Sequence, residues 1–516
     1  MIIPRPAELV GHPGEFAIGP AVHLVAGPGA ARAARLLAGY LGPDRPRTDR
    51  GPRIRLGLSE AAGLAPQGYE LVIRPDRVDL AAPDEAGLFN GVQTLRQLLP
   101  TRAFDPVAAS ADAWRWPCLT VRDAPRLPWR GAMLDVARHF MPLEFLYEFV
   151  DLLALHKLNV LHLHLTDDQG WRIEIDGLPR LTEVGAWRAE SMVGPAGSTV
   201  FDGVPHGGYY TQAELRALVG YAEDRGVTIV PEIEMPGHAR AILAAYPQLG
   251  NEPDRVLPVW TGWGISEDVL GVHDEVLEFC RTVLAQVIDV FPSRYIHIGG
   301  DECPTARWRT SARARRRARE LGLADPARLH GWFLRQMRDF LAEHGRRAVC
   351  WDEADQNGDL DVDMVLASWR DPAHGARAVE RGHQVVMAPH LSTYLDYPQR
   401  DHADEPPGNP NEVVTLSDVY RFDPLAGGLP VAGPDGGAGV LGAQAQLWTE
   451  HVQTPDHARY LMFPRLSALA EVAWSDGGRD IADFNRRLVA QRRRLGALGM
   501  MATGPLSQTV RSGADL

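Results

Sequence analysis

The sequence predicts an α/β protein, a (β/α)8 TIM barrel preceded by a small α+β domain. The first observation is a series of eight short apolar segments between residues 131 and 447, separated by helical or loop-like stretches. Near-continuous apolar strands that alternate with helices over about 350 residues are typical of a closed parallel barrel. The second observation is the different pattern of residues 1–122. The third is the length of 516 residues, which accommodates an accessory domain beside the barrel.

Residues 1–122 predict the accessory α+β domain. Three segments alternate between apolar and polar residues, as half-buried strands do, and they lie at 53–58, 69–75 and 77–83. Pro75 and Asp76 predict the turn of a hairpin between the last two strands. Helical patterns occupy residues 30–40 and 85–99, and the proline-rich stretch 117–128 predicts the junction between the two domains.

Residues 123–500 predict the barrel domain, and residues 501–516 a C-terminal tail. The eight barrel strands are expected at 131–137, 159–165, 227–233, 295–299, 348–351, 364–369, 384–388 and 440–447. Links with a helical period lie at 143–156, 212–225, 274–290, 328–344 and 375–381, and helices at 456–473 and 481–498 would close the ring. The link before the eighth strand is long and only weakly helical. The glycine- and proline-rich stretch 194–208 fits an active-site lid and a variable surface loop equally well.

The composition disfavours several classes of protein. Asp and Glu number 66 against 53 Lys and Arg, which gives a net charge of −13, and so acidic a chain is a poor binder of nucleic acids or anionic membranes. The arginine-rich segment 311–320 is therefore interpreted as the solvated face of a helix. No apolar run reaches the ~18 residues that span a bilayer, and residues 1–16 lack the pattern of a signal peptide. We expect a soluble, cytoplasmic protein.

Carboxylates and aromatic rings gather at the predicted strand ends, where barrels of this kind carry their catalytic groups. The residues at or just after these ends are Asp135, Arg138, Asp167, Asp168, Glu232, Glu234, His238, Asp301, Glu302, Trp351, Asp352, Glu353, Trp369, Tyr394, Asp396, Trp448 and Glu450. Aromatic rings can cover the apolar faces of pyranose sugars, while carboxylates and Arg bind the sugar hydroxyls. The pattern therefore predicts a glycoside-processing enzyme.

Two motifs could instead bind a metal ion. The HLHL motif places His162 and His164 on one strand, and a pair of aspartates follows at 167–168. Residues i and i+2 of a strand share one face, here inside a packed barrel, so satisfied core histidines are the favoured interpretation of the first motif. For the second motif, Arg138 and Arg172 are available as salt-bridge partners. We predict that the protein uses no metal and no cofactor.

Asp301 and Glu302 of the HIGGDE motif restrict the mechanism. A retaining glycosidase with two protein carboxylates holds them about 5–5.5 Å apart, and an inverting one about 6.5–9.5 Å apart, around the anomeric carbon. Neighbouring residues have Cα atoms ~3.8 Å apart and start from the same side of the sugar, so this pair cannot easily flank it. An attacking group on the substrate, such as a 2-acetamido oxygen, removes the difficulty. One carboxylate would then hold the amide and the other would protonate the leaving oxygen, and the preceding glycines allow a sharp bend.

The chain resembles the family 20 glycoside hydrolases, the β-N-acetylhexosaminidases, from about residue 85 to residue 474. The matching segments occur in family order: AGLFNGVQTLRQLL, PWRGAMLDVARHF, KLNVLHLHLTDDQGWRIEI, GGYYT, VPEIEMPGH, HIGGDE, TYLD, QLWTE and FPRLSALAEVAWS. The resemblance implies a small α+β domain before a (β/α)8 barrel, in agreement with the strand pattern. It also implies an exo-acting hydrolase that removes terminal β-linked N-acetylglucosamine or N-acetylgalactosamine, with a carbohydrate as its partner.

The resemblance further implies a role for each matching residue. Glu302 would be the general acid/base, and Asp301 would orient and polarise the acetamido group. Tyr394 would hydrogen-bond the acetamido oxygen, inside walls formed by Trp351, Trp369 and Trp448. Arg138 would contact O3 and O4, and Asp396 and Glu450 would contact O4 and O6. Asp167 and His238 would lie behind Glu302 and tune its acidity.

Two departures from the family pattern bear on function. Glu234 stands where many relatives have Asp, which adds a methylene to a supporting carboxylate. No tryptophan lies between Tyr394 and Tyr420, where some relatives stack one on the leaving sugar. The sequence therefore does not indicate how anything beyond the terminal sugar is recognised.

Two alternatives to an exo-acting hydrolase follow from the same residues. One is a disaccharide-releasing member of the family, which needs an open site beyond the O4 and O6 contacts; Arg138, Asp396 and Glu450 argue against it. The other is a catalytically silent amino-sugar-binding protein, which the complete set of acid, polariser and tyrosine disfavours. The sequence does not indicate the oligomeric state.

Overall fold

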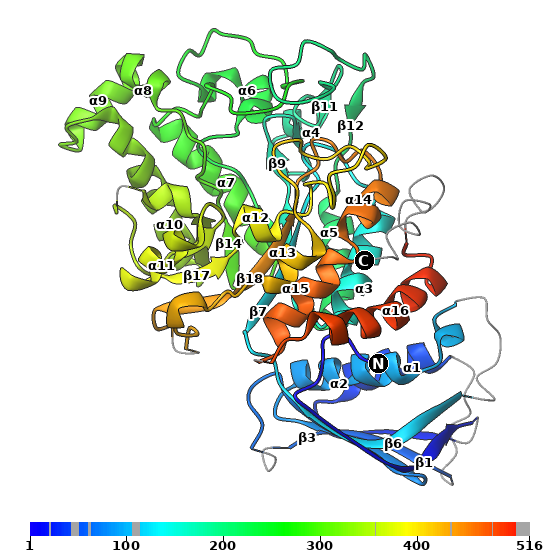
Figure 1. Ribbon diagram of the computed structural model, residues 1–516. Coiled ribbons are helices and arrows are strands. Elements are labelled where there is room, and N and C mark those ends of the chain that lie inside the picture. The colour runs from blue at the N-terminus through cyan, green and yellow to red at the C-terminus, as the bar shows by residue number, and fades with distance from the viewer. Residues whose placement is uncertain are drawn as a thin grey trace.

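A computed structural model describes residues 1–19, 22–42, 51–59, 63–105, 114–356, 358–433, 436–476 and 478–501. The chain forms a six-stranded sheet domain, followed by a closed eight-stranded barrel surrounded by helices (Figure 1). This arrangement confirms the predicted fold class. The tail predicted at 501–516 lies outside the described residues except for its first residue.

The N-terminal sheet has the strand order β1-β6-β4-β5-β3-β2. Its strands are β1 Glu8–Ile18, β2 His23–Ala26, β3 Arg53–Leu58, β4 Tyr69–Ile73, β5 Arg77–Ala82 and β6 Trp114–Asp123. Two helices, α1 (Ala31–Leu41) and α2 (Glu85–Leu98), lie between the sheet and the barrel (Figure 1), and a 3₁₀ turn follows at Thr101–Phe104. The three predicted strands and both predicted helices are therefore present.

About half of the stretch 117–128, which was predicted as a junction, belongs to strand β6. β6 lies between β1 and β4 in the sheet, and it includes Pro117. Pro117 lies beyond the end of its partner β4 and beside a bulge in β1 between Gly11 and Glu15. A missing amide hydrogen is tolerated at such a place, and the prolines therefore conceal a strand from sequence-based prediction.

The eight predicted barrel strands are all present, each within two residues of its predicted bounds. They close in the order β13-β14-β15-β16-β17-β18-β7-β8. Their bounds are β7 Trp129–Asp135, β8 Val160–His164, β13 Thr228–Glu232, β14 Tyr295–His297, β15 Arg347–Trp351, β16 Val365–Ser368, β17 Gln384–Met387 and β18 Gly439–Leu447. Nearly every residue of these strands is buried, as expected of parallel strands covered by side chains inside and helices outside.

The predicted connecting helices are also present, with shorter elements between them. The predicted ones are α3 Leu143–Leu155, α5 Gln212–Glu223, α7 Asp274–Val290, α10 Leu329–Glu343 and α11 Pro372–Glu380. The additional helices are α4 Arg180–Glu183, α6 Arg240–Ala245, α8 Ala306–Thr310, α9 Ala312–Glu320, α12 His390–Thr393 and α13 Leu416–Arg421. Four two-residue strands complete the loops: β9 Thr166–Asp167, β10 Gly170–Trp171, β11 Trp187–Arg188 and β12 His206–Gly207. In the arginine-rich α9 only alanines are buried, as predicted for a solvated helix face.

The two helices expected to close the ring differ from the prediction. The first is divided into α14 (Pro455–Met462) and α15 (Arg465–Trp474), because Pro464 lacks the amide hydrogen that a continuous helix needs. The second, α16 (Ile481–Ala497), lies against the N-terminal domain. There Arg494 donates to the carbonyls of Met1 and Gln97, both at 2.7 Å.

A buried ion pair joins the two domains. Lys157, the only lysine of the sequence, places its Nζ 3.0 Å from Asp123 Oδ2 and 2.9 Å from the Tyr69 hydroxyl. The Trp474 indole donates to the other oxygen of Asp123 at 2.9 Å. These contacts fix the end of β6 against the barrel. Among the described helices, none has both the length and the apolar character needed to cross a membrane.

Candidate active site

The residues predicted at the strand ends gather at the carboxyl end of the barrel, because all eight strands run in parallel. Adjacent strands β14 and β15 carry Asp301, Glu302 and Trp351, and β16 and β17 are followed by Trp369 and Tyr394. The opposite arc of the barrel, formed by β18, β7 and β8, carries Trp448, Glu450, Arg138 and Asp167. The structure therefore brings the residues that the sequence singled out together at one end of the barrel, although some of them, such as Glu232, are fully buried there.

The Asp301-Glu302 pair follows a sharp bend after β14. Gly299 and Gly300 have φ angles of 63° and 90°, and Glu302 also has a positive φ of 40°. A Cβ on Gly299 would lie 1.7 Å from Glu234 Oε2, so only glycine fits at this position. A positive φ at a non-glycine residue such as Glu302 is strained and is typical of functional sites. The bend expected from the two glycines is confirmed.

His238 connects the pair to the buried aspartates beneath it. Its Nδ1 lies 3.2 Å from Asp167 Oδ1 and 3.3 Å from Asp168 Oδ2. Its Nε2 lies 3.7 Å from Asp301 Oδ2 and 3.6 Å from Glu302 Oε2. Burial would lower the pKa of His238, but the charge of Asp167 and hydrogen bonds with Asp167, Asp168 and Glu302 hold it well above its usual value. A cationic imidazole thus lies within reach of both carboxylates of the pair.

Asp301 is a buried carboxylate that the fold leaves partly unpaired. Its Oδ1 is buried and has no hydrogen-bond partner among the described residues. Burial and the nearby Glu302 carboxylate raise the pKa of Asp301 to about 7, against the opposing charge of His238. The Glu302 side chain is more open, with 30% exposed against 12% for Asp301. Asp301 is therefore placed to hold a buried group, and Glu302 to meet a group that projects toward solvent.

Arg138 lies on the far side of the site from the pair. Its guanidinium contacts Asp167 Oδ2 at 2.7 Å and Asp135 Oδ2 at 3.4 Å, and lies over the Trp448 ring at 4.8 Å. Burial would lower the pKa of Arg138, but the charges of Asp167 and Glu450 raise it well above its usual value. The Asp135 carboxylate also accepts from backbone amides at the ends of β7 and β18, which fixes this corner.

Asp396 and Glu450 are the other two carboxylates on this side. Both oxygens of Asp396 are buried with no hydrogen-bond partner among the described residues. Burial and the charge of Glu450 raise the pKa of Asp396 to about 8. Burial also raises the pKa of Glu450, against the attraction of Arg138. Glu450 therefore lies within the influence of both the Arg138 cation and the buried Asp396 carboxyl.

Aromatic rings cover the remaining sides. Trp369 stacks on Tyr394, with ring centroids 6.3 Å apart, and Tyr394 lies 6.2 Å from Trp448. Trp351 lies 5.8 Å from Trp448 but is only 1% exposed. Its indole donates to Glu232 Oε1 at 2.9 Å, so it lies beneath the other rings rather than beside them. Trp369, Tyr394 and Trp448 form the wall, and Trp351 supports it from below.

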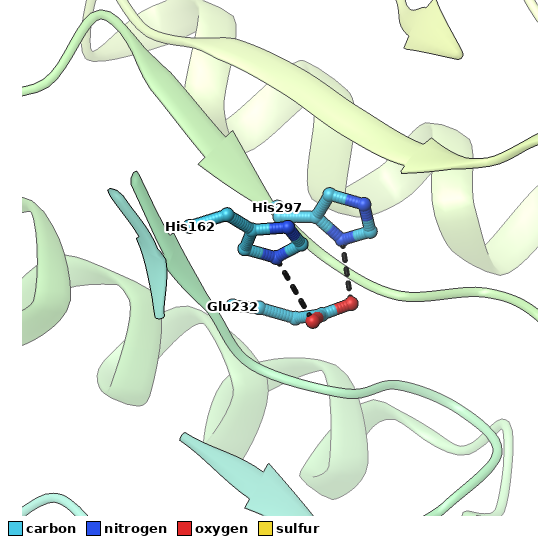
Figure 2. Close-up of side chains that lie close together, drawn as sticks. All are labelled: His162, Glu232 and His297. Carbon is cyan, nitrogen blue, oxygen red and sulfur yellow. Dashed lines mark ion pairs between the residues drawn. The ribbon is translucent and has the colours of Figure 1, made fainter. Parts of the chain in front are cut away.

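Glu232 is the centre of a buried network that the sequence did not identify. Figure 2 shows the imidazoles of His162 and His297 directed at its carboxylate, at 3.0 and 2.7 Å. His164 bonds the same carboxylate and contacts Asp167 Oδ2 at 3.0 Å. Against the effect of burial, the histidines hold the pKa of Glu232 well below its usual value. His162 and His164 are therefore satisfied core residues, as predicted, and the inward-facing HLHL alternation was the signal for this network.

Four groups of His, Asp and Glu among the described residues bring possible metal ligands within 4.8 Å of one another. In the group His162, Glu232 and His297, each imidazole is in ion-pair contact with the Glu232 carboxylate, at 3.0 Å for His162 and 2.7 Å for His297. Arg138 already binds Asp167, as expected, whereas Arg172 donates to backbone carbonyls, including Val136 at 2.9 Å. The groups differ in this respect, because both oxygens of Glu234 and Oδ1 of Asp301 have no hydrogen-bond partner among the described residues.

The stretch 194–208 is joined to the residues before it by hydrogen bonds. The amide of Asp202 donates to the carbonyl of Ser191 at 2.9 Å, and the amide of Ser191 donates to the Asp202 side chain at 2.8 Å. These contacts fit a surface loop and a lid equally well.

Comparisons with known proteins agree with this geometry. The catalytic domain of glycosyl hydrolase family 20 matches residues 127–477, and domain 2 of the same family matches residues 1–124. A beta-hexosaminidase of Porphyromonas gingivalis is 39% identical over 471 residues, covering 90% of this chain and 58% of that protein. One of Akkermansia muciniphila is 35% identical over 449 residues and covers 85% of each. The chain thus spans less than two thirds of the first of these relatives.

A similar solved structure is the GH20 exo beta-N-acetylglucosaminidase of Vibrio harveyi in complex with N-acetylglucosamine. It superposes with a TM-score of 0.85 at 31% identity, covering 98% of this chain and 78% of that one. The likeness therefore extends over both domains described above.

Proposed function

The chain belongs to glycosyl hydrolase family 20, and from this premise we propose that it is an exo-acting β-N-acetylhexosaminidase. It would remove terminal non-reducing β-linked N-acetylglucosamine or N-acetylgalactosamine from carbohydrates. The observation that carries the proposal is the Asp301-Glu302 pair, two adjacent carboxylates on one tight bend, linked through His238. Relatives named as hexosaminidases, one solved in complex with N-acetylglucosamine, support the substrate class.

The pair requires the substrate to supply its own nucleophile. Adjacent residues cannot readily lie on opposite faces of the anomeric carbon. The 2-acetamido carbonyl oxygen therefore attacks C1 and forms an oxazolinium ion, while Glu302 gives its proton to the departing glycosidic oxygen. Ionised Asp301 stabilises the positive charge that develops on the amide nitrogen, and the Tyr394 hydroxyl aligns the carbonyl. Glu302 then takes a proton from water, which opens the ring at C1 and restores the β configuration.

The buried groups beneath the pair favour this division of roles. His238, held cationic by Asp167, favours the charged form of Asp301. Its Nε2 contacts the Glu302 carboxylate as well, which fixes the direction in which Glu302 points. Asp167 in turn is held by Arg138 at 2.7 Å, so the sugar-binding arginine and the acid share one support.

The residues opposite the pair favour removal of a single terminal sugar. Arg138 is 6% exposed and Asp396 is 3% exposed, and both would contact O4. A disaccharide-releasing enzyme needs room beyond O4 for another sugar, which these buried groups deny. A silent sugar-binding protein is the other alternative, and it does not explain a strained Glu302 in contact with a cationic histidine.

Hydrolysis of p-nitrophenyl N-acetyl-β-glucosaminide, with p-nitrophenyl β-glucoside as the matched control, tests the proposal. We expect turnover of the first and a rate orders of magnitude lower for the second, which lacks the acetamido nucleophile. Proton NMR of the first-formed sugar, before mutarotation, should show the β anomer. No turnover would favour the silent binding protein, and a first-formed α anomer or a trapped glycosyl ester would eliminate substrate assistance.

A further inference from the structure

The sharp bend after β14 is braced by the segment that follows the neighbouring strand β15. The amide of Trp351, the last residue of β15, donates to the carbonyl of Gly299 at 3.0 Å. A 3₁₀ turn follows at Asp352–Asp355. Within this turn the Cβ of Ala354 lies 3.3 Å from the position that a Cβ on Gly300 would occupy. The turn therefore packs directly against the bend.

Glu353, in the same turn, contacts the backbone of Glu302. Its Oε2 accepts from the Glu302 amide at 3.4 Å, and this amide has no other acceptor among the described residues. The distance is long for a hydrogen bond, but a charged acceptor strengthens such a bond. A side chain from the β15 segment thus holds the main chain of the residue proposed as the acid.

Glu302 needs such a contact because its backbone is strained. Its φ of 40° lies in a region that non-glycine residues occupy only where surrounding contacts impose it. Glu302 and Glu353 also line the same cavity, of about 380 Å³. Without the Glu353 carboxylate, water in this cavity could bond the amide and the backbone would be free to relax.

Two side chains restrain different parts of Glu302. His238 lies 3.6 Å from its carboxylate, whereas Glu353 contacts its amide. The Glu302 side chain is 30% exposed and that of Asp301 is 12% exposed, so packing restrains Glu302 less and its position depends more on its backbone. Burial raises the pKa of Glu353, and the charge of Glu302 adds to this, while the Glu302 amide and Arg370 act in the opposite direction. The amide contact thus favours the ionised form of Glu353, which is the better acceptor.

We propose that Glu353 is a positioning residue for the general acid, and that it fixes the strained backbone of Glu302 by accepting its amide hydrogen. This inference rests on the proposed function, because it assumes that Glu302 protonates the glycosidic oxygen. A displaced acid transfers its proton less efficiently. Loss of the contact should therefore have its greatest effect on substrates whose leaving oxygen needs a proton.

Two substitutions at Glu353 separate the hydrogen bond from the charge. Glu353→Met keeps much of the volume but has no oxygen that accepts, whereas Glu353→Gln keeps an accepting oxygen and loses the charge. The substrates are the phenyl and 2,4-dinitrophenyl β-glycosides of N-acetylglucosamine, which differ in how much protonation the leaving oxygen needs. We expect Glu353→Met to lower kcat/KM about 10- to 50-fold on the phenyl glycoside and less than about threefold on the dinitrophenyl glycoside.

The other variants serve as rescue and control. Glu353→Gln should stay within about threefold of wild type on both substrates, because the amide keeps its acceptor. Gln356 is an exposed residue that lines the same cavity, and Gln356→Met is the matched control, which should change neither rate. Circular dichroism and the rate on the dinitrophenyl glycoside report whether each variant is folded.

The outcomes separate this inference from the function on which it rests. If the wild-type protein cleaves neither glycoside, the proposed function fails. If it cleaves both, the positioning role is overturned by a Glu353→Met loss that is absent or is equal on the two substrates. A loss in Glu353→Gln as large as that in Glu353→Met also overturns it, because the charge rather than the hydrogen bond would then be what matters.

Discussion

Glu232 and Glu234 lie two residues apart at the end of β13, with 0% and 1% of their surface exposed, yet their environments are opposite. Glu232 belongs to the core cluster, formed with His162, His164 and His297, and its carboxylate is fully paired. Both oxygens of Glu234 are buried without a partner among the described residues. Accordingly, the pKa of Glu232 lies well below its usual value. Burial and the charge of Asp301 instead raise the pKa of Glu234 well above its usual value.

The same contrast separates the whole core cluster from the catalytic face. There Asp301 and Asp396 also carry buried oxygens without partners, and their pKa values are raised to about 7 and about 8. An unpaired buried carboxylate costs stability, so a fold retains one only where something else uses it. The core cluster stabilises the barrel, and the catalytic face keeps its hydrogen-bonding capacity free for a ligand.

The largest effect is expected from the catalytic face. Glu302→Gln should lower turnover about 10²- to 10⁴-fold on substrates with poor leaving groups, because it removes the general acid. Activated aryl glycosides, which need little protonation, should lose less. Steady-state kinetics on a disaccharide and on a nitrophenyl glycoside measure the difference. Equal losses on both would mean that Glu302 does not act as the acid.

Matched substitutions at the two glutamates test the contrast itself. Glu232→Gln leaves a cationic histidine and an indole without their carboxylate, so the free energy of unfolding should fall by about 3–5 kcal/mol. Glu234→Gln removes only an unpaired acid, so the change should stay within about 1 kcal/mol. Urea denaturation at pH 7 measures both. A similar loss in the two variants would show that Glu234 has a protein partner in solution.

The titration of Asp301 predicts a smaller effect with a definite sign. Its pKa is raised to about 7 in the folded protein and is about 3.9 in an unfolded chain. Between these values the folded state holds a proton that the unfolded state has released, so this group makes stability fall as pH rises. The Asp301→Asn variant has no carboxyl at this position and therefore lacks this pH-dependent loss of stability. The Tm of the variant minus the Tm of wild type should increase by about 1–3 °C from pH 5 to pH 8. A difference that stays constant or falls would contradict the raised pKa.

The smallest effect is expected from chelation. The proposed reaction needs only proton transfer and charge stabilisation, and the possible ligand atoms of the core cluster bond one another at 2.7–3.0 Å. Prolonged dialysis against EDTA should change kcat/KM less than twofold. Activity that disappears and then returns with a divalent ion would show that one of the His and carboxylate groups binds metal.

The sequence by itself determined the barrel and the composition of its catalytic face. Each strand is a local run of apolar residues, and in a parallel barrel every strand end reaches the same face, so residues such as Asp301 and Trp448 could be placed there from spacing alone. The tight bend at Gly299 and Gly300 was likewise a local property. Prolines misled in both directions: Pro117 lies in a strand, and Pro464 divides a helix that was predicted as continuous.

Only the tertiary structure decided which buried carboxylates are paired. The partners of Glu232 come from β8, β14 and β15, far apart in the sequence, and nothing local distinguishes it from Glu234 two residues later. Pairing is a property of distant contacts in three dimensions, whereas strand pattern and backbone bends are local. The sequence therefore identified the candidate catalytic groups, and the fold determined which of them are paired within the protein.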